Sequence, residues 1–347
     1  MIEISRYILA VVVAQTHLWP QGAEWTGQIS VFAFYTLSGY LITRVLNTRY
    51  GFSWIGTSRF ITNRILRLWP AYAAITILVL VAVRFFPLAE FYPSIRTPQT
   101  AVEIVSAATI IGQTTFDFLQ RVEAEPLATS WSLSIEVSCY LLLALYFAKS
   151  PARLFAFLLL GLVGIAISTA RCASSSHVAE YGPYCFQNRY AVVQAGFVPF
   201  ACGGLFYFRQ KAFALWIGCH RTILVVALLA AGFAMFTGRA VSATIGPFLG
   251  IPLTWMLLVA AADARPTMLQ DFFGRASYHL FIAHMPTAAV LTIGLHFAPA
   301  GPTIFVTALA VALCLSAVLV PLERRLNVLR QRISATASVR PVPGTQL

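Results

Sequence analysis

The N-terminal stretch Arg6-Tyr-Ile-Leu-Ala-Val-Val-Val-Ala-Gln-Thr-His17 places an arginine and a histidine inside an otherwise apolar run. At about 100° per residue, eleven helical steps bring His17 back to within roughly 20° of Arg6, about 16 Å further along the axis. The two side chains therefore share one face of a predicted membrane helix, where ionisable groups are costly and usually mark a site or a pathway. An alternative interpretation is a histidine bonded to a neighbouring helix and an arginine that extends to the cytoplasmic interface.

The composition indicates a membrane protein. Hydrophobic residues make up 59% of the 347 residues and charged residues only 10%, far from the average of soluble domains. We predict an all-α integral membrane protein, a bundle of about ten transmembrane helices with both termini in the cytoplasm. The expected spans are 6–22, 29–47, 65–86, 131–148, 154–170, 191–208, 222–237, 244–262, 276–295 and 302–321.

The basic residues support this topology. A net charge of +12 could indicate a nucleic-acid-binding protein, but the arginines lie mostly between apolar runs, where the positive-inside rule explains them better. The predicted cytoplasmic side holds Arg44, Arg49, Arg59, Arg64, Arg67, Lys149, Arg153, Arg209, Lys211, Arg221, Arg265, Arg275, Arg324, Arg325, Arg330, Arg332 and Arg340. If the apolar stretch 101–118 crossed the membrane, every later loop would lie on the opposite side, and the basic loops would then face outward. We therefore expect an outer interfacial or re-entrant helix there.

The chain is expected to form one transmembrane domain, residues 1–329, followed by a disordered cytoplasmic tail, residues 330–347. Four of the six cysteines lie in or beside apolar runs and are expected to be core residues. Cys172 and Cys185 both fall in a predicted outer loop, where an oxidising compartment would allow a disulfide.

Two further groups of polar residues follow the first helix. Ser38, Gly39 and Tyr40 lie together in the second apolar run, where glycine allows close approach of another helix or of a ligand. Arg64 and Arg67 are three residues apart and so lie on one helix face. Two guanidiniums at a cytoplasmic mouth suit phosphate groups, although both could instead be topological anchors.

Polar residues also occur in two later helices. The stretch Trp131-Ser-Leu-Ser-Ile-Glu136 opens a predicted helix that Ser132 or Ser134 could cap, and it carries a carboxylate about one turn into the membrane. A carboxylate at that depth needs a partner or a function. Tyr278 and His284 lie about two turns apart in a later helix, where His284 could equally be a structural histidine.

Taken together and in this order, these groups resemble the acyltransferase-3 family of membrane O-acyltransferases, the type that acetylates O-antigens and exopolysaccharides. The resemblance runs from Arg6 to about Glu323. The matching stretches are Arg6-x10-His17, Leu37-Ser-Gly-Tyr-Leu41, Arg64-x-x-Arg67-Leu-x-Pro70-Ala-Tyr72, Trp131-Ser-Leu-Ser-x-Glu136, Ser277-Tyr278 with His284, and Glu323.

The resemblance implies transfer of an acyl group, usually acetyl, from cytoplasmic acyl-CoA to a hydroxyl of a carbohydrate or of a lipid-linked or secreted glycan. It also implies a bacterial-type inner (plasma) membrane, and no metal is expected. A histidine suits the task of taking a proton from a sugar hydroxyl, so His17 is the candidate base or acyl carrier. Arg6 and Glu136 are the other expected catalytic residues. Arg6 could bind donor groups or the oxyanion, and Glu136 could orient His17 or the acceptor hydroxyl. Arg64 and Arg67 are expected to hold the CoA phosphates, and the expected substrate-binding residues are Ser38, Tyr40, Trp131, Ser132, Tyr278 and His284.

A competing function is a proton-coupled transporter or flippase of an anionic substrate, because buried Arg, Glu and His residues also line such pathways. A transporter would move its substrate without consuming acyl-CoA. The paired arginines and the combined stretches favour an enzyme that uses a donor.

The predicted topology can be tested by cysteine accessibility. Single cysteines near Arg59 and Arg332 should be labelled only from the cytoplasm, and those near Tyr92 and Gly182 only from outside, because basic loops stay inside. Labelling of the Arg332 and Tyr92 positions from one and the same side would exclude ten spans.

Overall fold

The computed structural model describes residues 2–20, 25–114, 122–174, 190–237, 246–261 and 267–335. Within these ranges the regular structure is entirely helical. The α-helices are α1 (Ile2–Leu18), α2 (Trp25–Val45), α3 (Trp54–Val83), α4 (Ala101–Thr109), α5 (Ser130–Leu145), α6 (Pro151–Ser174), α9 (Val193–Phe208), α10 (Gln210–Thr237), α12 (Gly250–Ala260), α13 (Met268–Leu295) and α14 (Pro302–Ala335). Short helices of other types occupy Leu46–Tyr50, Leu88–Glu90, Phe147–Lys149 and Gly246–Leu249.

The lengths of the helices support a membrane protein. Five described helices, α2 (with its extension to Tyr50), α3, α6, α13 and α14, are long and apolar enough to cross a bilayer. The two arms of α10, bent by 77°, would make a sixth if they form one span. Helices α5, α9 and α12 are apolar but shorter, and α1 has 17 residues. The all-helical membrane fold is confirmed, whereas about ten crossings and cytoplasmic termini stay predictions.

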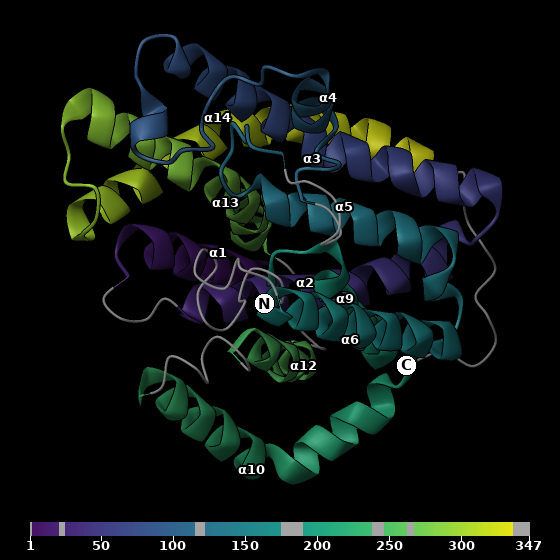
Figure 1. Ribbon diagram of the computed structural model, residues 1–347. Helices are drawn as coiled ribbons and strands as arrows, with labels where there is room; N and C mark the ends of the chain where they lie inside the picture. Colours follow the sequence, from purple (N-terminus) through teal and green to yellow (C-terminus); the bar gives the residue numbers. More distant parts are fainter. Residues whose placement is uncertain are drawn as a thin grey trace.

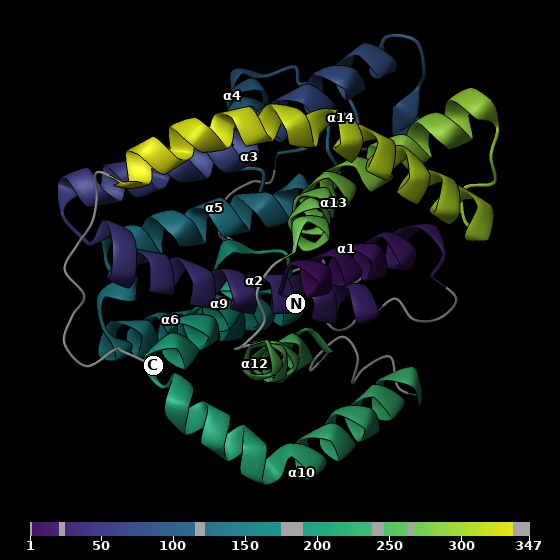
Figure 2. The ribbon, with the colours of Figure 1, turned by 180° about the vertical axis from the view of Figure 1, so that it is seen from behind.

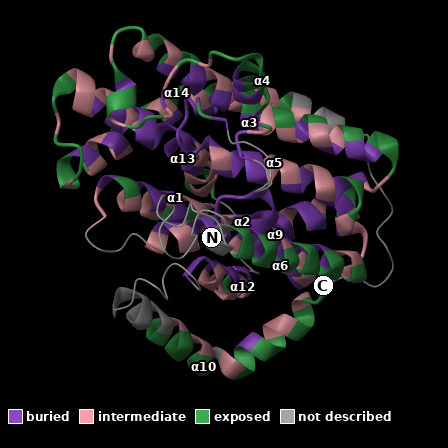
Figure 3. Ribbon diagram, in the orientation of Figure 1, coloured by how far each residue is buried: buried purple, intermediate pink, exposed green. Residues whose placement is uncertain are grey.

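The bundle has a central layer and a periphery. Figures 1 and 2 show α1 and α2 in the middle, α3 and α14 along one edge, and α10 as a bent pair of arms along the opposite edge. In the most apolar segment of each helix, buried residues make up 72% of the positions in α2 and 61% in α13. The share is 33% in α3 and in α14, and 22% in α6. Figure 3 shows exposed residues on the outer helices, and the exposed large hydrophobic residues are mostly Ile, Leu and Val, as expected for surfaces that face lipid.

Glycines allow α2 and α9 to pack backbone to backbone. A Cβ at Gly39 would lie 2.2 Å from the carbonyl oxygen of Phe200, and one at Gly203 would lie 1.9 Å from that of Thr36. No larger residue fits at either position without separating the helices. Gly39 therefore allows a close approach, as the sequence indicated, and what approaches it is helix α9.

Helix α4 belongs to the stretch expected to lie outside the bilayer core. It has nine residues, too few to cross the roughly 30 Å of hydrocarbon, and ends at Ile110 in the left-handed conformation. It packs on α3, since the Tyr72 hydroxyl donates to the carbonyl of Ala107 at 2.9 Å. The Glu103 carboxylate accepts backbone N–H groups of Gln99, Thr100 and Ala124, which hold its pKa below the ordinary value. Residues 115–118 lie outside the described part.

Other predictions cannot be compared with the structure. The proposed Cys172–Cys185 disulfide and most of the 171–190 loop lie outside the described residues, as does the tail after Ala335. Helix α14 continues to Ala335, so the first residues of the segment expected to be disordered, 330–335, are helical. Of the remaining cysteines, Cys139 is buried and Cys202 partly buried, but Cys219 and Cys314 are exposed, so the expectation of core positions is wrong for the last two.

The α2–α9 crossing generates a stability prediction. Gly203→Val should lower the thermal unfolding temperature in detergent, because overpacking costs about 1–3 kcal/mol and here the obstacle is backbone. Gly218→Val in α10 is the matched control, since a Cβ there meets nothing within 4 Å. Equal unfolding temperatures for the two variants would contradict the close crossing.

Candidate active site

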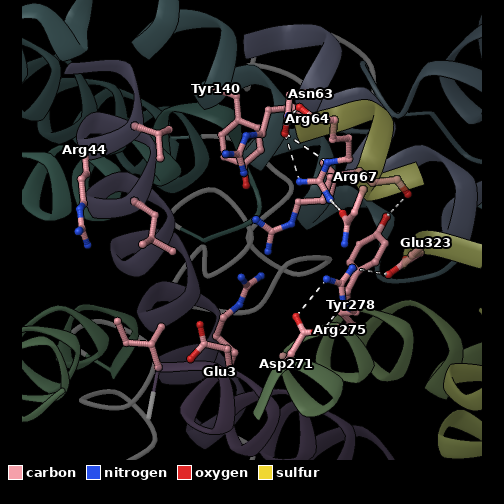
Figure 4. Close-up of a pocket in the computed structure, with 18 of the residues that line it drawn as sticks. Glu3, Arg44, Asn63, Arg64, Arg67, Tyr140, Asp271, Arg275, Tyr278 and Glu323 are labelled. Atoms are coloured by element: carbon pink, nitrogen blue, oxygen red, sulfur yellow. Dashed lines mark hydrogen bonds and ion pairs between the residues drawn. The ribbon is translucent and has the colours of Figure 1, made fainter. Parts of the chain in front are cut away.

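A large cavity opens at one end of the bundle. It has a volume of about 520 Å³ and lies where the first turns of α1 and α13, the first half of α3 and the last turns of α2 and α14 meet. Figure 4 shows its side chains converging from these helices. Its polar and charged lining residues are Glu3, Arg6, Arg44, Arg49, Tyr50, Asn63, Arg64, Arg67, Glu136, Tyr140, Asp271, Arg275, Tyr278, Glu323, Asn327, Arg330 and Gln331.

The cavity carries an excess of positive charge. Seven of its lining residues are arginines and four are carboxylates, an excess of three positive charges if all are ionised. Apart from Arg6, every one of these arginines belongs to the set that the sequence assigns to the cytoplasmic side. The chain therefore gathers arginines from distant loops around one space, where a polyanion would be attracted.

Two of these arginines, Arg64 and Arg67, lack acidic partners. Within the described part of the chain neither forms an ion pair. The Arg64 guanidinium lies 5.2 Å from the ring centre of Phe60 and 5.9 Å from that of Tyr140, and its buried Nε has no hydrogen-bond partner. The buried Nε of Arg6 is also without one. Such donors are costly unless an anion completes the site.

The arginines at the rim of the cavity differ, because protein groups hold them. Arg275 pairs with Asp271 at 3.0 Å and with Glu323 at 3.6 Å. The Arg330 guanidinium donates to Asn63 at 3.2 Å and to Asn327 at 2.6 Å. These contacts join α3, α13 and α14 around the cavity, so they fix its shape as well as its charge.

Glu136 lies at the inner limit of the cavity. Its carboxylate accepts hydrogen bonds from the Ser38 hydroxyl at 2.8 Å and from the Tyr140 hydroxyl. The sequence left two roles open for Glu136, orienting His17 or orienting the acceptor hydroxyl. The structure pairs Glu136 with Ser38 and Tyr140 and not with His17.

A narrow second pocket of about 40 Å³ adjoins the cavity. The two spaces share Arg6, Glu136 and Tyr278, and the small pocket is also lined by Phe34 and Phe281. The rings of Phe34 and Phe281 meet edge to face with centres 6.0 Å apart. A small apolar group could extend from the charged cavity into this space.

His17 lies at the opposite end of α1 from Arg6. Its Nδ1 is 2.9 Å from Nε2 of His284 on α13, and the two rings meet edge to edge through these nitrogens, nearly coplanar at an interplanar angle of 8° with centres 5.2 Å apart. The ring of Phe281 lies 6.3 Å from that of His284, so the narrow pocket ends next to this histidine pair. His17 is exposed, whereas His284 is completely buried.

The sequence matches the acyltransferase domain family Acyl_transf_3 over residues 2–320, nearly the whole chain. The chain belongs to the acyltransferase-3 family. It is accordingly a membrane acyltransferase. Neither the curated proteins nor the solved structures contain a match to this chain.

The structure brings most of the expected site residues of this acyltransferase-3 protein together. Arg6, Arg64, Arg67, Glu136 and Tyr278 line the large cavity. Ser132 lines the small pocket while its hydroxyl donates to the Thr129 carbonyl, and the Tyr278 hydroxyl donates to the Leu68 carbonyl at 3.0 Å.

Two expected substrate-binding residues of this family member pack against the protein. The Tyr40 hydroxyl donates to Gln210 at 3.3 Å, and Trp131 meets the ring of Tyr190 with centres 5.2 Å apart. Neither lines the two spaces described above. Both residues therefore contribute to packing in this structure.

Sequence reasoning did not single out several polar residues of this acyltransferase. Asn63, Arg275 and Arg330 were unremarked or counted only as topological charges. His279, which received no role, is fully buried, with its two ring nitrogens 3.0 Å from Ser316 and 3.0 Å from Glu323. Ser316 and Glu323 lie on a later helix, α14, so no motif or helical period in the sequence indicates that they contact His279.

Proposed function

We propose that this acyltransferase moves an acyl group, acetyl in the simplest case, from cytoplasmic acyl-CoA to a hydroxyl of a carbohydrate or of a lipid-linked or secreted glycan, in a bacterial-type inner membrane. The observation that carries the proposal is the cavity of excess positive charge. Forked guanidiniums without acidic partners suit the phosphate groups of CoA. The small volume of the narrow pocket that adjoins this cavity, about 40 Å³, supports a small acyl group.

The chemistry follows from the positions of the residues. CoA phosphates would bind Arg64 and Arg67, and the pantetheine arm would carry the thioester along α1, which rises about 16 Å from Arg6 to His17. His17 takes the proton of the acceptor hydroxyl as its oxygen attacks the thioester carbonyl. The carbon–sulfur bond then breaks, and the thiolate leaves and gains a proton to become free CoA.

Other residues fit supporting roles. Arg6, which lines both spaces, could stabilise the oxyanion that forms on the thioester carbonyl. Glu136 balances part of the positive charge beside Arg6 and is itself held by Ser38.

The direct test is incubation of the purified protein with labelled acetyl-CoA and a panel of glycans. Transfer of label to a glycan is expected, together with release of free CoA. Movement of an anionic substrate across proteoliposomes without consumption of acyl-CoA would instead favour a transporter.

His17→Ala is predicted to lower acyl transfer about 10²–10⁴-fold while leaving insertion and folding largely intact, because loss of a positioned base has effects of that size. The measurement is the single-turnover rate at saturating acyl-CoA. His220→Ala is the control, since His220 is a half-buried histidine on α10 whose Nδ1 bonds the Trp216 carbonyl. A well-folded His17→Ala protein with normal activity would eliminate His17 as base or acyl carrier.

Arg64→Lys and Arg67→Lys are predicted to weaken acyl-CoA binding more than the chemical step, because lysine keeps the charge but loses the planar fork. Alanine at either position should weaken binding further, and high salt should partly mimic the loss. Acyl-CoA affinity and single-turnover transfer separate the two effects. Arg153→Lys is the control, because Arg153 lies on the same predicted side but stacks on Tyr146 away from the cavity. Parent-like affinity in both variants would make Arg64 and Arg67 topological anchors only.

A further inference from the structure

We infer that His284 is a positioning residue which fixes the tautomer of His17, so that Nε2 of His17 is the atom that takes the proton from the acceptor. This inference rests on the proposed function, in which His17 is the base. It replaces the expectation that His284 binds substrate. His284 exposes none of its surface, so the structure gives it no face for a substrate, whereas His17 is exposed.

The hydrogen bonds of the pair determine where the protons lie. Nδ1 of His284 is 3.0 Å from the carbonyl oxygen of Leu280, which can only accept, so this nitrogen carries a hydrogen. In a neutral His284 the other nitrogen, Nε2, then has a lone pair and accepts. It faces Nδ1 of His17 at 2.9 Å, so that nitrogen must be the donor. Nε2 of a neutral His17 is left without a hydrogen and is free to act as a base.

The alternative arrangement requires a charged His284. If both of its nitrogens carried hydrogens, His284 would donate to His17 and force the hydrogen of His17 onto Nε2, which would then be no base. A fully buried imidazolium needs a counter-charge. Within the described residues the ring of His284 contacts His17, Phe281 and the Leu280 carbonyl, with no carboxylate among them.

The two histidines differ in exposure, which fits one for orienting its partner and the other for reacting with the acceptor. The partner that orients is enclosed by protein, and the partner that reacts is exposed, so an acceptor can reach His17 while His284 stays fixed. The two rings are nearly coplanar, at 8° to each other, so the lone pair of His284 Nε2 lies in the plane of the His17 ring, in line with the hydrogen bond. A single hydrogen bond to one ring nitrogen is enough to select the tautomer of a neutral histidine.

The test is nitrogen NMR of protein labelled with ¹⁵N-histidine at neutral pH, in which protonated and unprotonated ring nitrogens have separate shifts. Comparison with His17→Ala assigns the His17 signals. The expected result is a protonated Nδ1 and an unprotonated Nε2 for His17. The opposite tautomer in the parent protein would overturn the inference, and this readout needs neither substrate nor a variant of His284.

Two substitutions extend the test to catalysis. His284→Leu removes the acceptor, and it should release the tautomer of His17 and lower kcat about 10²–10⁴-fold with little change in the KM for acyl-CoA. His284→Gln keeps an acceptor oxygen near the position of Nε2, and it should retain the tautomer and restore much of kcat. A folded His284→Leu protein with parent-like kcat, or one whose His17 keeps the parent tautomer, would contradict the inference.

The two proposals fail in different ways. If His17→Ala is fully active, the proposed base is wrong even when the spectrum shows the expected tautomer. If His17→Ala is inactive but His17 carries its hydrogen on Nε2, the proposed function stands and the role of His284 is wrong. His220→Leu is the control for both measurements, because His220 lies on α10 and contacts neither histidine.

Discussion

The cost of burying a charged group without a partner is the constraint on which this structure depends. The helices gather seven arginines around one space and provide only four carboxylates there. Asp271 and Glu323 pair with Arg275 at the rim, while Arg64 lies beside the rings of Phe60 and Tyr140 and has no acidic partner in the described part of the chain. The cavity is therefore shaped and charged for an anion that the protein itself does not supply.

The packing of α1 against α13 connects the charged cavity with the histidine pair. Gly274 at the start of α13 allows the side chain of Glu3 on α1 to approach closely, since a Cβ there would lie 2.9 Å from Glu3. From this contact the two helices run side by side, so Arg6 and Tyr278 both reach the charged cavity while His17 and His284 meet further along. One helix pair thus holds both the charged cavity and the proposed base.

The crossing of α2 and α9 positions Ser38, which bonds the carboxylate of Glu136. Backbone contact at Gly39 and Gly203 places α2 deep in the bundle, and this position brings Ser38 within 2.8 Å of Glu136 on α5. The sequence grouped Ser38 with Tyr40 as substrate-binding residues. Because the two side chains leave the helix in different directions, Ser38 faces the site, whereas Tyr40 contacts Gln210.

The sequence by itself determined the membrane class, the family and one face of the first helix, because hydropathy, motif spacing and a 3.6-residue period are local properties. It also placed Arg64 and Arg67 on one face and indicated close packing at Gly39. The number of crossings does not follow from hydropathy alone, because α5 and α9 are apolar but have 16 residues each, fewer than the roughly 20 that cross a bilayer.

Only the tertiary structure decided which partners these residues have. His17 meets His284 and Asn63 meets Arg330, each pair 267 residues apart in the sequence. Such pairs carry no periodic signal, because their distance depends on how α1 packs on α13 and α3 on α14. The tautomer of His17 likewise follows from a carbonyl one turn before His284, which acts only once the two helices are in contact.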